Sequence, residues 1–187
     1  MYVVFEGIDN AGKTTQIPYV QQQLAQWKSE RYFEKLKIKK IAEKEIKPSK
    51  DSPYPNKELA LKYALQRLPI QKELEENHHN IILSDRSYIS SMAYQGLCEK
   101  HSWVKDINNF MYVPDLVVFF QTNPPTPYLE QVQENYERLL NYYNYVYITV
   151  QPPYEKISQT TDIISRKIEH MWESSYKKEY ERKVYYQ

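Results

Sequence analysis

Short apolar runs alternate with longer segments of helical periodicity along the chain. The apolar runs predict five strands, at residues 2–5, 36–42, 81–83, 116–120 and 145–150. Helical patterns span residues 14–27, 56–77, 87–97, 102–111, 128–143 and 157–180, with a potential break of the second helix near Pro69. Strands that alternate with helices are typical of β-α-β units. We therefore predict an α/β fold with a three-layer, doubly wound, parallel five-stranded sheet, in one domain over residues 1–187 with a frayed tail after about residue 176.

The junction between the first strand and the first helix carries the clearest chemical signal. Gly7, four further residues and then Gly12-Lys13-Thr14 fit the phosphate-binding pattern G-x-x-x-x-G-K-[ST]. Glycines let backbone N–H groups curl around a phosphate, and the helix N-terminus adds its positive dipole end. In this pattern Lys13 supplies a mobile positive charge for the β- and γ-phosphates, and the Thr14 hydroxyl ligates Mg²⁺. The chain has only 3 glycines and two of them stand here, which favours a phosphate site over a bare strand–helix turn.

Charge and cysteine content narrow the class of protein. Lys and Arg number 25 against 24 for Asp and Glu, and this balance argues against a general nucleic-acid binder. The single cysteine, Cys98, excludes a disulfide framework and suits a reducing compartment; we interpret it as a packing residue. The sequence shows no N-terminal signal pattern and no apolar run near ~18 residues. We expect no membrane segment and a cytoplasmic location.

One helix face combines an aromatic and a basic residue. Tyr63 and Arg67 are four residues apart, so they share a face of the second predicted helix. A ring that stacks beside a guanidinium that donates hydrogen bonds suits a nucleobase. A core tyrosine next to a surface arginine would show the same spacing, so the pair alone leaves both interpretations open.

A second group follows the third predicted strand. Asp85 and Arg86 come directly after an apolar run, at the carboxyl end where open α/β sheets bind their ligands. Ser90 and Tyr94 follow Arg86 at a spacing of four, again on one helix face. The alternative interpretation is that Asp85 only caps the helix.

Taken in order, these motifs resemble the thymidylate kinase family, which phosphorylates dTMP with ATP. Residues 5–16 resemble its phosphate loop, and residues 84–96 (Ser-Asp-Arg-Ser-Tyr-Ile-Ser-Ser-Met-Ala-Tyr-Gln-Gly) its Asp-Arg-Tyr…Ser…Ala-Tyr-Gln-Gly motif. Residues 63–67 resemble its Phe-x-x-[Asp/Asn]-Arg helix, and residues 132–139, with Tyr136, its Val-Arg-x-x-Tyr-x-x-Leu helix. The resemblance runs from residue 2 to about 165 and implies a P-loop NTPase, or nucleotide kinase, fold.

The resemblance also implies roles for matching residues. ATP would be bound by the loop residues Gly7, Ile8, Asp9, Asn10, Ala11, Gly12, Lys13, Thr14 and Thr15, with Mg²⁺ on Thr14 and Asp85. The residues implied for dTMP are Asp9, Tyr63, Arg67, Arg86, Ser91, Tyr94 and Gln95. Within this set Tyr63 stacks on thymine, Arg67 reaches O4, Ser91 lies near N3, Tyr94 lies under the deoxyribose and Arg86 binds the phosphate. Catalysis would rest on Lys13, Asp85, Arg86 and Asp9, and the protein would be a homodimer. We interpret Glu6 as a residue that orients the loop, with direct contact to a ligand as the alternative.

Two departures from the family pattern qualify this resemblance. The Arg-Glu-Pro loop after the second strand has no clear counterpart near residues 45–48, so Lys44, Lys47 or Lys50 would bind phosphate instead, unless this basic stretch is only a solvated face. The arginine-bearing lid after the fourth strand is missing, and Asn10 stands where some members carry an arginine in the phosphate loop. The alternatives are therefore another nucleoside or nucleotide kinase, with dUMP as the nearest competing substrate, and a catalytically weak nucleotide-binding paralogue.

Overall fold

The strands form one parallel sheet. The computed structural model describes residues 1–53, 55–151 and 156–177. Its strands are paired in the order β2-β3-β1-β4-β5, and every pairing is parallel. They are β1 (Tyr2–Gly7), β2 (Ile38–Ala42), β3 (Ile81–Asp85), β4 (Leu116–Phe120) and β5 (Tyr147–Val150). The predicted five-stranded parallel sheet is confirmed.

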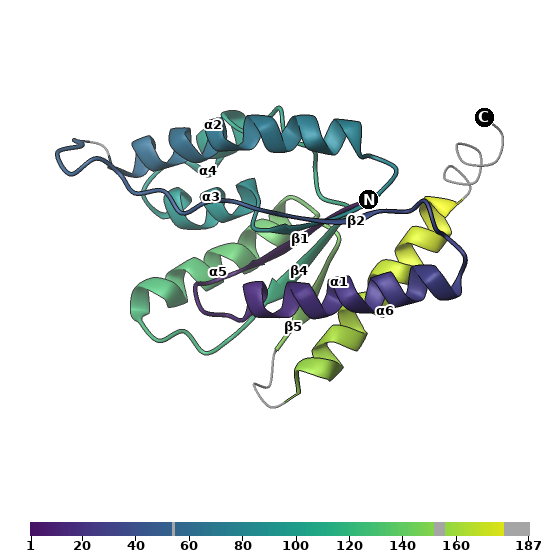
Figure 1. Cartoon of the computed structure of the whole chain (residues 1–187). Coiled ribbons are helices and arrows are strands. Elements are labelled where there is room, and N and C mark those ends of the chain that lie inside the picture. Colours follow the sequence, from purple (N-terminus) through teal and green to yellow (C-terminus); the bar gives the residue numbers. More distant parts are fainter. Residues whose placement is uncertain (54, 152–155, 178–187) are drawn as a thin grey trace.

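Helices cover the sheet on both faces, as a doubly wound fold requires. They are α1 (Lys13–Glu30), α2 (Pro55–Glu76), α3 (Tyr88–Tyr94), α4 (His101–Asp106), α5 (Pro127–Tyr142) and α6 (Ile157–Ser175), with a 3₁₀ turn, η1 (Gln95–Leu97), after α3. The helices α1 and α6 pack together on one side, whereas α3 packs on α2, α4 and α5 on the other (Figure 1). The three-layer arrangement is therefore confirmed.

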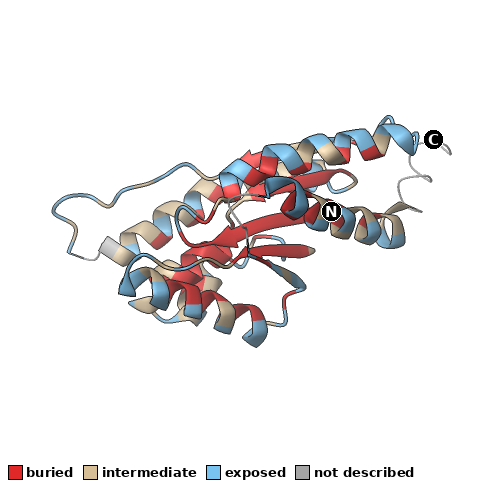
Figure 2. Cartoon of the chain, turned by 90° about the horizontal axis from the view of Figure 1, so that it is seen from below, coloured by how far each residue is buried: buried red, intermediate tan, exposed pale blue. Residues whose placement is uncertain are grey.

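The core lies along the central strands. Both β1 and β4 are buried over their whole length (Figure 2), which explains their apolar sequences, because strands covered on both faces lose the alternation of polar and apolar residues. On one face an aromatic cluster joins α1 to α6: the ring centroid of Trp172 lies 5.6 Å from that of Trp27 and 4.9 Å from that of Phe33. This packing fixes the helix that begins in the phosphate loop.

The predicted break at Pro69 is wrong. Helix α2 runs continuously through this residue, although proline cannot donate the usual hydrogen bond to the carbonyl four residues earlier. Both Pro69 and Leu65 are exposed, so water can satisfy the carbonyl that is left without its helical partner. Tyr63 and Arg67 both precede Pro69 on this helix.

Other boundaries differ from the prediction in detail. The helix predicted over residues 102–111 ends at Asp106 and continues as turns. Helix α6 ends at Ser175, and the tail predicted to fray, like the helix predicted up to residue 180, lies largely outside the described residues. Cys98 is exposed, so its interpretation as a packing residue is wrong. Over the described part of the chain, no helix combines the length and the apolar character needed to cross a membrane.

Candidate active site

The loop between β1 and α1 depends on two glycines. Gly7 has a φ of +139°, and a Cβ at this position would lie 2.6 Å from the carbonyl oxygen of Phe120 on β4. Gly12, directly before α1, has a φ of +91°. Both values lie in a region that side-chain-bearing residues rarely adopt. The two glycines therefore let the chain turn sharply from a buried strand into a helix whose N-terminus lines a pocket.

Lys13 lies against this loop. Its Nζ donates hydrogen bonds to the carbonyls of Gly7 at 2.9 Å and Ile8 at 2.6 Å. Burial lowers the pKa of Lys13 to about 8, and the nearby cation of Arg86 acts in the same direction. An anion that entered the loop would favour the charged ammonium again. The buried lysine is thus poised for a negatively charged ligand.

Thr14 and Asp85 meet at the carboxyl edge of the sheet. The Thr14 hydroxyl donates to Asp85 Oδ2 at 2.6 Å. The helix that follows is capped by Ser87, whose Oγ accepts from the N–H of Ile89 at 3.2 Å, so the interpretation of Asp85 as the cap is wrong. A hydroxyl and a carboxylate fit Mg²⁺, which takes oxygen ligands from one or two protein groups and the substrate phosphates. The described residues hold no cluster of three or more His, Cys, Asp or Glu side chains suited to a metal.

Arg86 connects the phosphate loop to α3. It adopts a left-handed φ of +75°, and its Nη1 donates to Ser90 Oγ at 3.0 Å and to the Gly7 carbonyl at 3.3 Å. Its Nη2 forms an ion pair with Asp9. The guanidinium carbon lies 5.3 Å from the ring centroid of Tyr94, whose hydroxyl accepts from the N–H of Asp9 at 3.0 Å. The predicted proximity of Arg86, Ser90 and Tyr94 is therefore seen in the structure.

Glu6 lies behind the loop and is fully buried. Its carboxylate accepts hydrogen bonds from the hydroxyls of Ser87 and Ser90, both at 2.6 Å, and of Tyr136 at 3.1 Å. Burial raises the pKa of Glu6, while the two serine hydrogen bonds act to lower it. Glu6 is not among the residues that line the pocket, which agrees with a role in orienting the residues that do.

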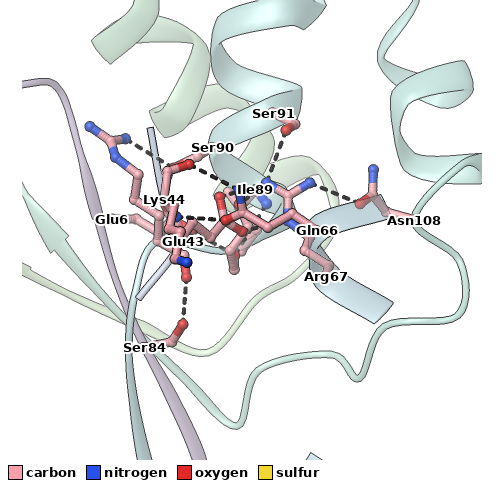
Figure 3. Close-up of polar contacts among 12 residues, drawn as sticks. Glu6, Glu43, Lys44, Gln66, Arg67, Ser84, Ile89, Ser90, Ser91 and Asn108 are labelled. Atoms are coloured by element: carbon pink, nitrogen blue, oxygen red, sulfur yellow. Dashed lines mark hydrogen bonds and ion pairs between the residues drawn. The ribbon is translucent and has the colours of Figure 1, made fainter. Parts of the chain in front are cut away.

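Arg67 is the best-anchored cation of the site (Figure 3). It is only 1% exposed and makes a two-pronged ion pair with Glu43, in which Nη2 lies 2.9 Å from Oε2. It also donates to Asn108 Oδ1 at 2.9 Å and to Ser91 Oγ at 3.0 Å. Its guanidinium carbon lies 5.6 Å from the ring centroid of Tyr63. The alternative of a surface arginine is therefore wrong.

The sequence analysis missed Glu43. It is the first residue after β2, so it stands at the same carboxyl edge of the sheet as Asp85, the last residue of β3, and that position was the signal that could have revealed it. Gln66 on α2 fixes the loop that follows: its Oε1 accepts from the N–H of Lys44 at 2.6 Å and its Nε2 donates to the Lys44 carbonyl at 3.0 Å. The Tyr63 hydroxyl accepts from the N–H of Ile46 at 3.3 Å.

These groups surround one pocket of about 870 Å³, within the range of ligand sites in proteins. Every residue that the resemblance assigned to ATP, dTMP or Mg²⁺ lines it except Gly7 and Ile8, whose carbonyls hold Lys13 instead. The pocket also contains residues that the sequence analysis did not assign: Gln16, Glu43, Glu45, Ile46, Asn56, Leu59, Tyr128 and Ile157. The Gln95 side-chain oxygen is buried without a hydrogen-bond partner among the described residues, so a donor on a ligand could satisfy it.

The two departures from the family pattern have different structural outcomes. Lys44 lines the pocket, whereas Lys47 does not and instead lies 3.9 Å from the exposed Glu45; Lys50 is exposed and outside the pocket lining. Residues 121–126, which contain no arginine, join β4 directly to α5. The structure therefore shows no lid at this connection, and of the three candidate lysines only Lys44 lines the pocket.

Together, the strand order, the glycine-bounded loop and the arginine after β3 define a P-loop nucleotide kinase fold. A model of the thymidylate kinase family matches residues 5–137. The chain is 32% identical to the probable thymidylate kinase of Methanobrevibacter smithii over 186 residues, which cover 87% of this chain and 92% of that one. It is also 32% identical to the thymidylate kinase of Campylobacter lari over 127 residues, covering 64% and 63% of the two chains.

The chain thus belongs to the thymidylate kinase family. The crystal structure of thymidylate kinase from Ehrlichia chaffeensis superposes with a TM-score of 0.68, covering 90% of this chain and 98% of that chain at 19% identity. At that identity the likeness concerns the fold alone. Family membership makes the protein a nucleoside monophosphate kinase, a class of phosphotransferase.

Proposed function

We propose that this protein transfers the γ-phosphoryl group of ATP to dTMP, giving ADP and dTDP, with Mg²⁺ and in the cytoplasm. The observation that carries the proposal is the shared pocket, which is lined both by the phosphate loop with Lys13, here called the donor end, and by the Tyr63–Arg67 face, here called the base end. A site that holds two nucleotides in fixed positions has most of what phosphoryl transfer needs, because positioning and charge neutralisation supply most of the rate.

Each end of the pocket has a defined task in this proposal. Lys13 and the loop N–H groups bind the phosphates of ATP, and Thr14 and Asp85 would hold Mg²⁺, which neutralises charge on the phosphates when bound. Arg86 binds the phosphate of dTMP. Arg67 donates to O4 of thymine through the second N–H of Nη1, because its Nε and Nη2 are bonded to Glu43 and the other Nη1 hydrogen is donated to Asn108.

A coupled assay of ADP release in the presence of dTMP, beside ATP binding measured without dTMP, tests the proposal. We expect ADP release that depends on dTMP. The missing lid favours one competing function, a nucleotide-binding protein with little turnover. In related systems an arginine that contacts the transferring phosphoryl group raises the rate by ~10³-fold or more. ATP binding without ADP release would favour that alternative and overturn the proposal.

We also propose that the protein is a homodimer formed through α2, which lies on the outside of the molecule (Figure 1). Leu61, Leu65 and Leu68 form a stripe that is 47%, 65% and 50% exposed. Glu58 and Lys72 stand at the two ends of this stripe, and each already has an ion-pair partner on its own helix, Lys62 and Glu76. Two antiparallel copies would pair leucine with leucine and add an acid–base contact at each end.

Sedimentation velocity on the variant Leu65→Glu tests the dimer. We expect a monomer, because a charge would be buried at the centre of the interface. The matched control is Val146→Glu, which places the same charge at a 53% exposed valine outside α2 and should leave the dimer intact. A wild-type protein that sediments as a monomer, or a dimer that survives Leu65→Glu, would contradict this interface.

A further inference from the structure

The buried Glu6 acts on Arg86 through two hydroxyl groups. An ionised carboxylate can only accept hydrogen bonds, whereas a hydroxyl has a single proton to donate. Ser90 and Tyr136 each lie within hydrogen-bond distance of Glu6 Oε2, at 2.6 Å and 3.1 Å. Both therefore direct their proton toward Glu6, and their lone pairs remain available on the other side.

Arg86 lies on that other side. Its Nη1 is 3.0 Å from Ser90 Oγ and 3.4 Å from the Tyr136 hydroxyl oxygen. The two hydroxyl oxygens are 2.8 Å apart and could donate to each other, but a carboxylate behind them makes both acceptors toward the arginine. Glu6 thereby takes the protons of both hydroxyl groups, so that their oxygens can accept from Nη1, which also donates to the Gly7 carbonyl at 3.3 Å.

The opposite nitrogen of the guanidinium has a different environment. Nη2 is paired with Asp9, whose side chain is 60% exposed, whereas the Arg86 side chain is 22% exposed. Asp9 can thus turn away into solvent, but Glu6, with no exposure, cannot. Nη1 of Arg86 therefore keeps its partners, whereas Nη2 can exchange Asp9 for another anion.

We propose that Glu6 is a positioning residue for the acceptor phosphate: it fixes Nη1 of Arg86 through Ser90 and Tyr136, so that Nη2 exchanges Asp9 for the phosphate of the nucleoside monophosphate. This inference rests on the proposed function, in which Arg86 binds that phosphate. It predicts that Glu6 contributes to recognition of the phosphate and not of the base.

Calorimetric titration with dTMP and with thymidine separates recognition of the phosphate from recognition of the base, because the nucleoside lacks only the phosphate. We expect the wild-type protein to bind dTMP more tightly than thymidine. In Glu6→Gln the side-chain amide must donate one hydrogen bond where the carboxylate accepts. The ratio of the Kd for thymidine to the Kd for dTMP should therefore fall by about tenfold or more, which corresponds to the loss of one hydrogen bond to a charged group. The affinity for thymidine should not change.

Two tyrosine variants provide a matched pair. Tyr136→Phe removes a hydroxyl between Glu6 and Arg86 and should reduce the same ratio, which keeps the test valid if Glu6→Gln does not fold. Tyr145→Phe removes another buried hydroxyl, 2.8 Å from that of Tyr88. It should lower the melting temperature without changing the ratio, as a purely structural defect would.

The outcomes distinguish the inference from the proposed function. If the wild-type protein binds dTMP no better than thymidine, both the inference and the proposed function are wrong, because the protein then has no site for the phosphate of dTMP. If the wild-type ratio is high and stays unchanged in Glu6→Gln and Tyr136→Phe, the positioning role of Glu6 is wrong and the proposed function stands. A ratio that falls equally in Tyr145→Phe would also overturn the positioning role.

Discussion

The two ends of the pocket are built in different ways. At the base end, Arg67 is buried and bonded to Glu43, Ser91 and Asn108, which come from three separate segments of the chain. At the phosphate-donor end, Lys13 donates to two carbonyls of its own loop, and the short connection from β4 to α5 adds no arginine.

Because of this difference, we expect substrate selectivity and turnover rate to depend on different parts of the pocket. Preorganised, interlocked donors discriminate well between ligands, because a wrong base leaves buried polar groups unpaired. The rate of phosphoryl transfer depends on cations at the transferring group. Four basic residues of the described chain line the pocket, and with Arg67 assigned to the base, Lys13, Arg86 and Lys44 remain for this task. We therefore expect a selective enzyme whose turnover depends strongly on each of these few cations.

The largest effect should come from Lys13→Met at the donor end. It removes the only cation of the phosphate loop, so turnover should fall by about 10³-fold or more. Lys13 is 5% exposed, so thermal unfolding must accompany the rate measurement. Binding of dTMP should persist in a folded variant, and near-normal turnover would contradict the kinase function.

A substantial but smaller effect should follow changes in Arg67 at the base end. Arg67→Ala should narrow the gap in kcat/KM between dTMP and dCMP, mainly through loss of activity toward dTMP. Alanine at position 67 also leaves the buried Glu43 carboxylate without its partner, which costs about 3–5 kcal/mol of stability in such pairs. Glu43→Gln is therefore the milder companion variant, and it should also narrow the gap in kcat/KM between dTMP and dCMP. An unchanged gap in both folded variants would show that this face does not read the base.

The smallest effect should come from the lysines of the β2–α2 segment. Lys44 lines the pocket and Lys47 does not, so Lys44→Ala should reduce turnover by about tenfold, as expected for the loss of one charged contact to phosphate. Lys47→Ala, the matched control three residues away, should have no effect. If neither variant changes the turnover, the basic stretch is only a solvated face.

The sequence predicted the donor end better than the base end for a physical reason. The phosphate loop is local: its glycines, lysine and threonine lie within eight residues, Gly7 to Thr14, and one strand and one helix position them. The base end is assembled by tertiary contacts, so no spacing connects Arg67 with Glu43 or Asn108. The same holds for Glu6, whose three hydroxyl partners lie 81, 84 and 130 residues away.

The most direct test compares kcat/KM of the wild-type protein for dTMP, dUMP and dCMP by ADP release under one set of conditions. Thymine offers a carbonyl at position 4 and an N–H at position 3, which suit Arg67 and the Ser91 hydroxyl, whereas cytosine would place its amino donor against the arginine. We expect dTMP first, dUMP weaker by ~10- to 200-fold for want of the methyl group, and dCMP weaker by ~10⁴-fold. Efficient phosphorylation of dCMP, or equal use of all three, would contradict the account.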